Sequence, residues 1–488
     1  MDHASIAETS RFGEFLSRIG GALDERVTEP TPDALAMRDA WADLEHVELP
    51  EVGVGADPVI DQITEQLIPH GARMIDPAFW MFITAGPTTV PVVAATAALV
   101  AGTQRQTIHA FHALEETSLR WLAQLVGLPG EMRGLYSSGG STANLVALGA
   151  ARQFAFESRG IDPAEQGFDG TTSVVYASTE AHHTIQRSMA VLGMGRRNLR
   201  LIPVDNRQHM MPEELAEAMD ADLRAGLIPI AVVANAGTTN TGAIDPLRRL
   251  GEMAHARGCW FHVDGAYGLP GILDERVAQR YDGLDLADSA IVDPHKWLNT
   301  PVGVAATFVR DRSILQRAFA QGAAEYLEGS FSTQEEGVVV SVDSLGLPYS
   351  DFGVELSATS RGVQVWALIR EQGRAGIAER IRLDNDFAHY VAERARADER
   401  LESLTDPELS IACIRYVGNG QHDDLDDVNE RIYRRLLRET PYLPSTTVVN
   451  GKLAIRPCFI NPRTTWPMVE AFVETLLQMG NQLEVAQE

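Results

Sequence analysis

Short apolar runs alternate with helical stretches between about residues 86 and 310 of the chain. The clearest runs lie at 173–177, 228–233, 260–263 and 290–292. Because these runs lack the polar–apolar alternation of half-exposed strands, they predict strands covered on both faces, in a mainly parallel sheet flanked by helices. Glycines and polar residues directly follow the runs, and open sheets of this kind bind ligands at the carboxyl ends of their strands. We therefore expect the functional site at that edge of the sheet.

The hydrophobic pattern differs on either side of this region. The first 85 residues predict amphipathic helices split by proline-rich turns, and such helices need another body, such as a second subunit, to cover their apolar faces. Near the C-terminus, 410–417 and 452–457 predict strands of a smaller α+β unit. We predict a helical N-terminal dimerisation segment (1–85), a large ligand-binding domain (86–380) and a small C-terminal α+β domain (381–488).

The net charge of the chain argues against some classes of binding partner. Among the 488 residues, 41 Lys and Arg stand against 67 Asp and Glu, which gives a formal net charge of −26. Nucleic-acid binding needs a basic surface, so we expect neither a nucleic-acid nor a membrane partner. The three cysteines (Cys259, Cys413 and Cys458) show no CxxC spacing, so we expect no disulfide framework and no metal site. Without an apolar run of about 18 residues or a signal-peptide pattern, the chain is predicted to be cytoplasmic.

Two motifs carry the strongest chemical signal. Lys296 lies in the Asp-Pro-His-Lys-Trp segment 293–297 after an apolar run, and Asp264 ends another run, before Gly265 and Ala266. A lone lysine is usually a surface residue, but this pair predicts pyridoxal phosphate (PLP). A partly desolvated lysine supplies the neutral amine that binds PLP as a Schiff base. A carboxylate beside the pyridine nitrogen keeps it protonated, so that the ring can act as an electron sink.

Three further segments follow predicted strands and are weaker signals alone. The glycine-serine segment 137–145 precedes a helix, and a helix N-terminus with exposed N–H groups suits a phosphate, although many such loops are plain turns. Segment 178–184 holds two adjacent histidines, which point in different directions and so rarely bind one metal ion, whereas one imidazole can stack on a pyridine ring. In segment 234–245, Thr239 could bond a ring substituent, or the segment is a polar turn.

Taken in this order, the five motifs resemble the group II PLP-dependent amino-acid decarboxylases, the family of the aromatic L-amino acid, glutamate and tyrosine decarboxylases. The His-Lys-Trp triplet with an upstream Val-Asp-x-Ala-Tyr pattern is the most specific feature, and the resemblance runs from about residue 70 to the C-terminus. It implies PLP fold type I (aspartate-aminotransferase-like), an α/β fold with a mainly parallel seven-stranded sheet in which the large domain binds PLP. It also implies a homodimer with shared active sites.

The resemblance implies a role for each position that matches the family's motifs. Lys296 matches the Schiff-base lysine, and Asp264 matches the partner of the pyridinium nitrogen. His182 matches the histidine that stacks on the ring, and Tyr349 matches the tyrosine that protonates the substrate carbanion. The positions that match cofactor contacts are Gly140, Ser141, Thr142, His182, Thr239, Asp264, Ala266, Asp293, His295 and Lys296. Relatives commonly have glutamate at the position of Thr142, which is a departure from the pattern.

Tyr349 bears on the type of reaction. Segment 348–366 aligns with the family's mobile catalytic loop without gaps, and relatives that form aldehydes by oxidative deamination tend to have phenylalanine at this position. The tyrosine therefore favours simple decarboxylation to an amine and carbon dioxide, unless it is only a surface loop residue. The alternatives are an oxidative deaminase that forms an aldehyde, a decarboxylase of an acidic amino acid, and a non-catalytic protein of the same fold.

The substrate is less clearly indicated than the cofactor. Relatives line the side-chain pocket with the stretches that match 79–85 and 108–115, and the pocket candidates here are Phe79, Phe82, Ile83, His109 and Phe111. Segment 108–115 carries bulkier residues than the family's usual pattern. The overall layout is most similar to the aromatic branch, and no arginine can be placed in the pocket for an acidic side chain. The favoured substrate is therefore an aromatic L-amino acid.

Overall fold

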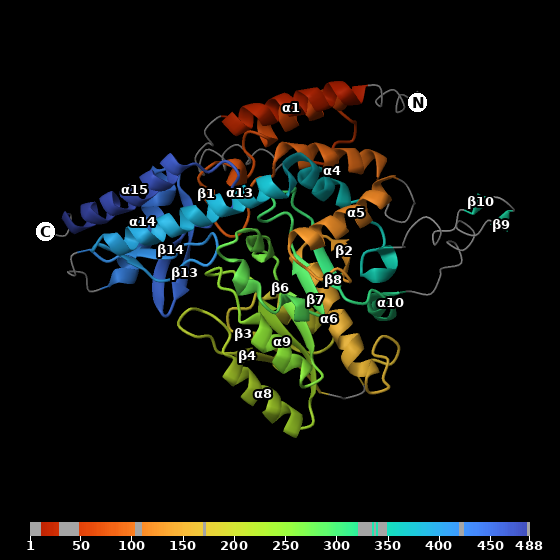
Figure 1. Ribbon diagram of the computed structural model, residues 1–488. Coiled ribbons are helices and arrows are strands. Elements are labelled where there is room, and N and C mark those ends of the chain that lie inside the picture. Colours follow the sequence, from red (N-terminus) through yellow and green to blue (C-terminus); the bar gives the residue numbers. More distant parts are fainter. Residues whose placement is uncertain are drawn as a thin grey trace.

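The computed structural model describes residues 11–28, 48–102, 110–168, 172–320, 334–335, 338–339, 349–418 and 424–485. Two large β-sheets with separate hydrophobic cores organise these residues, and a long helix, α13 (Gly362–Ala397), extends from one to the other (Figure 1). A short ribbon pairs β9 (Gln334–Glu335) with β10 (Val338–Val339). Among the described residues, no helix combines the length and apolar character needed to cross a membrane.

The larger sheet has seven strands in the order β2-β8-β7-β6-β5-β3-β4. Their bounds are β2 (Arg133–Ser137), β3 (Ser173–Ser178), β4 (Leu199–Ile202), β5 (Ile228–Asn235), β6 (Trp260–Asp264), β7 (Ser289–Val292) and β8 (Ala305–Val309). Strand β8 is antiparallel to β2 and β7, and the other neighbours are parallel. Strands β3, β5, β6 and β7 are buried along their whole length, as their continuous apolar runs predicted, and β8 is buried in the same way. The predicted α/β fold with a mainly parallel seven-stranded sheet is confirmed.

The helices of the large unit pack against this sheet, against one another or against α13 (Figure 1). They are α4 (Thr89–Ala101), α5 (Ala110–Leu125), α6 (Gly140–Glu157), α7 (Thr184–Val191), α8 (Pro212–Arg224), α9 (Leu247–His255) and α10 (Ser313–Phe319). Helix α6 contacts β5, β6, β7 and β8, whereas α8 and α9 contact β4, β5 and β6. Short helical turns complete the unit at Arg196–Asn198, Leu269–Leu273, Ala278–Tyr281, Leu284–Leu286 and Tyr349–Phe352.

The smaller sheet combines strands from both ends of the chain in the order β1-β13-β14-β12-β11. Its strands are β1 (Phe79–Trp80), β11 (Leu401–Ser403), β12 (Ile414–Tyr416), β13 (Leu443–Val449) and β14 (Lys452–Arg456), and its helices are α14 (Leu425–Glu439) and α15 (Trp466–Val485). Helix α13 packs on α4 and α5 at one end and on β11, β12 and α15 at the other, with a break at Gly373, whose φ is 63°. Helix α13 therefore joins the two units, and β1 brings the N-terminal part of the chain into the smaller sheet.

The N-terminal helices lie at the periphery (Figure 1). They are α1 (Phe12–Thr28), α3 (Ala56–Gln62), the π-helical turn Ile63–Leu67 and the short turn Arg73–Ile75. Large apolar side chains on α1 and α4 are exposed, among them Phe12, Leu16, Leu23, Val27, Val90, Val93, Leu99 and Val100. Contiguous exposed apolar surface usually marks an interaction site. The division of the chain at residues 85 and 380 stays a prediction.

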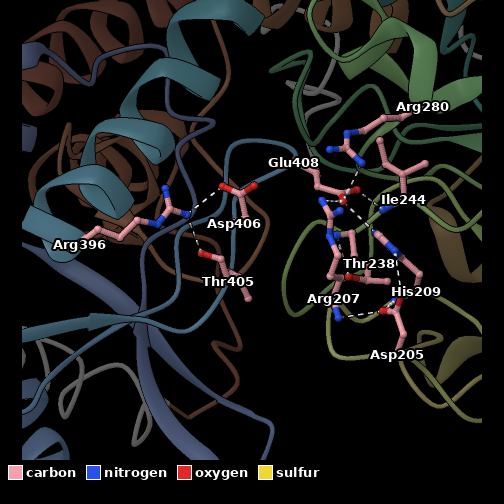
Figure 2. Close-up of polar contacts among 11 residues, drawn as sticks. Asp205, Arg207, His209, Thr238, Ile244, Arg280, Arg396, Thr405, Asp406 and Glu408 are labelled. Carbon is pink, nitrogen blue, oxygen red and sulfur yellow. Dashed lines mark hydrogen bonds and ion pairs between the residues drawn. The ribbon is translucent and has the colours of Figure 1, made fainter.

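A buried carboxylate joins the C-terminal part of the chain to the large unit (Figure 2). Glu408 lies in the loop between β11 and β12, and 4% of its side chain is exposed. One of its oxygens accepts hydrogen bonds from three side chains, at 3.3 Å from Arg207, 2.8 Å from His209 and 2.9 Å from Arg280. The other oxygen accepts the N–H of Ile244 at 3.0 Å. We call this arrangement the Glu408 clamp, and it fixes the C-terminal loop against the segment that follows β5.

Candidate active site

A cavity of about 360 Å³ lies at the carboxyl ends of β3, β5, β6 and β7, beside the N-terminus of α6. All ten positions that the sequence matched to cofactor contacts line it: Gly140, Ser141, Thr142, His182, Thr239, Asp264, Ala266, Asp293, His295 and Lys296. They come together because each of their segments follows or ends a strand of the same sheet, or begins α6. The volume is typical of small-molecule sites.

Lys296 reaches the cavity from the turn after β7. Its Nζ lies 3.2 Å from Oδ2 of Asp293, and 23% of its side chain is exposed. The other oxygen of Asp293 is buried and has no hydrogen-bond partner among the described residues. Gly140 makes room for this carboxylate, since a Cβ at that position would lie 2.6 Å from Oδ2. The chain has only two lysines, and the other, Lys452, pairs with Glu402 on the smaller sheet.

Asp264 ends β6 and lines the same cavity, with 7% of the residue exposed. Its Oδ2 accepts a hydrogen bond from Nδ2 of Asn144 at 3.0 Å, and its Oδ1 accepts the N–H of Ala266 at 3.2 Å. Each carboxylate oxygen has lone pairs for about two donors, so both oxygens can still accept from a ligand. A protonated ring nitrogen would supply such a donor.

His182 follows β3 and is neutral at neutral pH. Burial lowers its pKa to about 4; the Asp264 carboxylate opposes this change, and the positive charge of Lys296 adds to it. Its Nδ1 lies 2.9 Å from the hydroxyl of Thr184, and the ring centroids of His182 and His183 are 4.1 Å apart. The imidazole can therefore pack against an aromatic ring without adding a positive charge.

The N-terminus of α6 offers an anion site at one end of the cavity. Unpaired N–H groups and the helix dipole favour a phosphate there. Ser141 is exposed at this end, and the hydroxyl of Thr142 lies 3.0 Å from that of Ser138. His295 donates from Nδ1 to the carbonyl oxygen of Val304 at 2.5 Å, which leaves Nε2 for another contact.

These groups fit PLP, which combines an aldehyde, a pyridine nitrogen and a phosphate. Lys296 offers an amine for the aldehyde, and Asp264 offers an acceptor for the protonated nitrogen. The helix N-terminus suits the phosphate. Asp293, whose Oδ2 lies 3.2 Å from Nζ of Lys296, adds a negative charge beside the amine.

The structure does not bring Tyr349 to the cavity. Its side chain is buried, with 1% of the residue exposed, and its hydroxyl donates to Oε1 of Glu116 on α5 at 2.7 Å. Arg312 binds the same carboxylate at 2.6 Å. Burial alone would raise the pKa of Glu116, but Arg312 and Tyr349 together lower it. In its own chain Tyr349 therefore lies outside the cavity, held by the Glu116 carboxylate, and its catalytic role stays a prediction.

None of the predicted substrate-pocket residues within the described ranges lines the cavity. Phe79 is buried in β1, and Ile83 packs against the core of the large unit. Phe111 lies on α5. Phe82 is 63% exposed, and its φ of 56° lies in the left-handed region. His109 lies outside the described residues. The described pocket candidates are therefore not part of this cavity, and their contact with the substrate stays a prediction.

Several polar residues that shape the cavity were missed in the sequence; among them are Asn144, Thr184, Asn235 and Arg456. Arg456 is 4% exposed and donates to the carbonyl oxygens of Thr239, Asn240 and Phe82. It thereby ties the Thr239 loop to the segment after β1. An arginine at the end of an apolar strand was the signal for this residue. No sequence pattern indicated Asn144, since its position in the predicted helix looks like any other.

Residues 42–417 match the family model described as the pyridoxal-dependent decarboxylase conserved domain. The chain is 32% identical over 358 residues to the aromatic-L-amino-acid decarboxylase of Bacillus atrophaeus, which covers 72% of this chain and 70% of that one. It is 28% identical to the phenylacetaldehyde synthase of Arabidopsis thaliana, over 84% of this chain and 82% of that one. Its fold is similar to that of Oryza sativa TDC, solved with PLP and tryptamine, with a TM-score of 0.87 and 24% identity over 99% of both chains.

Proposed function

The chain belongs to the pyridoxal-dependent decarboxylase family, and we propose that it converts an aromatic L-amino acid to the corresponding amine and carbon dioxide. Family membership identifies it as a PLP-dependent amino-acid decarboxylase of fold type I. The observation that carries the proposal is that Lys296 and Asp264, far apart in sequence, line one cavity together with the N-terminus of α6.

Each residue of the cavity has a proposed task. When bound, PLP supplies the electron sink for breaking the bond between Cα and the carboxylate. Lys296 would hold the cofactor through its amine, and Asp293, whose Oδ2 lies 3.2 Å from Nζ, would balance the charge of that amine whenever it is free and protonated. Asp264 keeps the ring nitrogen protonated through a charge-assisted hydrogen bond, and neutral His182 packs against the ring. Electrostatic preorganisation of this kind is usually the largest contribution to catalysis.

The remaining contacts orient the cofactor. We assign the phosphate to Gly140, Ser141, Thr142 and His295, a ring substituent to Thr239, and the face below the ring to Ala266. For Tyr349 to return a proton to Cα, as the resemblance implies, its hydroxyl would first have to leave Glu116. That role therefore requires a rearrangement of the turn Tyr349–Phe352.

An aromatic substrate is favoured by the similarity to the Bacillus atrophaeus enzyme and by the charge of the cavity. Among the described residues that line the cavity, no arginine is present to bind a second carboxylate, which argues against an acidic substrate. The similarity to phenylacetaldehyde synthase supports a second candidate. In that reaction the amino acid would react with one molecular oxygen and one water, to give carbon dioxide, an aldehyde, ammonia and hydrogen peroxide.

A panel of the twenty amino acids tests the reaction directly. The purified protein is incubated with PLP and each amino acid, and carbon dioxide, amine, aldehyde and hydrogen peroxide are measured. We expect carbon dioxide and amine in equal amounts from an aromatic amino acid, without peroxide. Equal amounts of aldehyde and peroxide would replace the proposal by the second candidate.

Lys296→Ala tests the site, with Lys452→Ala as the matched control. The first variant should lose the visible absorbance of the bound cofactor together with turnover, whereas the second should keep both. Borohydride reduction of the loaded wild type should attach the cofactor to the peptide that contains Lys296, and leave Lys452 unmodified. Retention of absorbance and turnover in Lys296→Ala would overturn the assignment.

We further propose that the enzyme is a cytoplasmic homodimer in which residues 1–85 form part of the subunit contact. The exposed apolar side chains of α1 lie within these residues and support such a contact. The three cysteines are buried free thiols, which suits a reducing compartment. Sedimentation analysis should give twice the mass of one chain, and a monomer that retains full activity would contradict shared active sites.

A further inference from the structure

The amide of Asn144 is the branch point of a buried hydrogen-bond network beside the cavity. Asn144 lies on α6 and is 2% exposed. Its Nδ2 donates to Oδ2 of Asp264 at 3.0 Å and to the hydroxyl of Thr184 at 3.3 Å. Its Oδ1 lies 2.9 Å from Nε2 of His262, which is fully buried on β6. One side chain thus contacts three residues around the site.

The carboxylate fixes the direction of every bond on the first branch. An ionised carboxylate only accepts, so the NH₂ of Asn144 faces Asp264 and its carbonyl oxygen must accept from Nε2–H of His262. Burial lowers the pKa of His262 to about 4, so the ring is neutral and its Nδ1 is an acceptor. That nitrogen lies 2.8 Å from the hydroxyl of Ser289, which itself accepts the indole N–H of Trp260 at 2.7 Å. All donors from Trp260 to Asp264 therefore point the same way.

The second branch reaches His182. Because the hydroxyl of Thr184 accepts from Asn144, its proton points to Nδ1 of His182 at 2.9 Å. The backbone N–H of Thr184 points to the same nitrogen at 3.4 Å. Nδ1 is thus an acceptor, and neutral His182 carries its proton on Nε2.

We propose that Asn144 and His262 are positioning residues, which hold Asp264 and His182 in the orientation and hydrogen-bonding state that PLP binding requires. The inference rests on the proposed function. The bond from Asn144 uses one lone pair of Asp264 and leaves the others for the ring nitrogen. His262 keeps the amide from flipping, which would place its carbonyl oxygen against the carboxylate. Aligned hydrogen bonds in a buried chain strengthen one another, so the network also stabilises the negative charge of Asp264.

Asn144→Leu removes the branch point, and Asn429→Leu is the matched control. Asn429 is also a fully buried amide, and its three hydrogen bonds go to the backbone of Tyr416 and Leu425 in the C-terminal unit. Both substitutions should lower the thermal midpoint of the protein. Asn144→Leu should in addition weaken PLP binding to the apo-protein by about 10- to 100-fold, the range expected for losing a hydrogen bond to a charged group.

Two substitutions of His262 separate positioning from packing. Glutamine can donate to Asn144 and accept from Ser289, whereas leucine can do neither. The dissociation constant for PLP should stay close to the wild-type value in His262→Gln and rise in His262→Leu. A pH titration of the visible absorbance band of the bound cofactor gives a second, spectroscopic measurement. Its midpoint should shift in Asn144→Leu and His262→Leu, and should stay the same in Asn429→Leu.

The outcomes distinguish this inference from the proposed function. A wild-type protein that binds no PLP would overturn the proposed function itself. If the wild type binds PLP, but Asn144→Leu matches Asn429→Leu in PLP affinity and in the pH titration, the positioning role is excluded while the function stands. If Asn144→Leu does not fold, the His262 pair decides, because equal dissociation constants in its two variants would also exclude the role.

Discussion

Replacing Glu408 measures how firmly one buried carboxylate holds the C-terminal loop against the large unit. Glu408→Leu removes the acceptor for the N–H of Ile244 and the ion-pair partner of His209, whose side chain is 16% exposed. Arg207 and Arg280 also lose their partner, but 54% and 39% of their side chains are exposed, so water can solvate them again. Most of the effect should therefore come from Ile244 and His209.

The magnitude follows from the burial of these partners. A buried N–H without an acceptor costs roughly 1–3 kcal/mol, and each half-exposed arginine pair contributes about 0–1 kcal/mol. The free energy of unfolding should therefore fall by about 2–4 kcal/mol in Glu408→Leu. Glu408→Gln keeps an acceptor for the N–H of Ile244 but loses the charge, so its decrease should be about 1–2 kcal/mol.

The Glu408 clamp also predicts a pH dependence. Burial alone would lower the pKa of His209, but Glu408, Asp205 and Asp245 together raise it. Because the folded state then holds the proton more tightly than the unfolded state, the stabilisation is complete below the ordinary histidine pKa of about 6.5 and is lost as the pH rises through the raised value. The difference in stability between wild type and Glu408→Gln should therefore be larger at about pH 6 than at about pH 9.

Urea unfolding of the PLP-loaded protein, followed by circular dichroism at both pH values, measures these differences. The matched control is Asp406→Asn, two residues earlier in the same loop (Figure 2). Asp406 pairs with Arg396 at the surface, with 64% and 47% of the side chains exposed, so its loss should change stability by less than about 0.5 kcal/mol. The reasoning would be refuted if the free energy of unfolding fell equally in Glu408→Leu and Asp406→Asn. It would also be refuted if the difference in stability between wild type and Glu408→Gln increased with pH.

Two further substitutions test the candidate site. Gly140→Ala places a methyl group 2.6 Å from Oδ2 of Asp293 and should weaken PLP binding by about tenfold, measured by titrating the apo-protein; an unchanged dissociation constant would show that the carboxylate moves aside freely. Tyr349→Phe removes the bond to Glu116 and should lower the free energy of unfolding by about 1 kcal/mol. Because its hydroxyl is the predicted proton donor to Cα, the product should also shift from amine to aldehyde and peroxide. An unchanged kcat and an unchanged ratio of amine to aldehyde would contradict the catalytic role that the sequence predicted.

The cofactor site could be predicted because strand ends determine it. Strands β6 and β7 are adjacent and parallel, so the residues at and after their carboxyl ends, Asp264 and Lys296, meet at one edge of the sheet. Strands β3 and β5 continue the same edge and bring His182 and Thr239 to it. The uninterrupted apolar runs marked these strands in the sequence, and the polar residues behind each run marked the edge.

Features that depend on packing between distant segments could not be predicted in this way. The position of Tyr349 depends on Glu116 and Arg312, which belong to two other helical segments. The aligned positions of a loop say nothing about which carboxylate its hydroxyl will meet. Likewise, the role proposed for Asn144 depends on His262, on a strand more than a hundred positions later. Only the folded sheet brings these two side chains together.

The same architecture separates cofactor binding from substrate recognition. All predicted cofactor contacts lie between residues 140 and 296, on the ends of buried strands and on the helix that packs against them. The predicted substrate contacts instead come from residues 79–111, where β1 belongs to the smaller sheet and α5 packs against α13. None of the described pocket candidates lines the cavity, so these outer segments would have to move toward the strand ends to form a substrate wall beside the cofactor contacts.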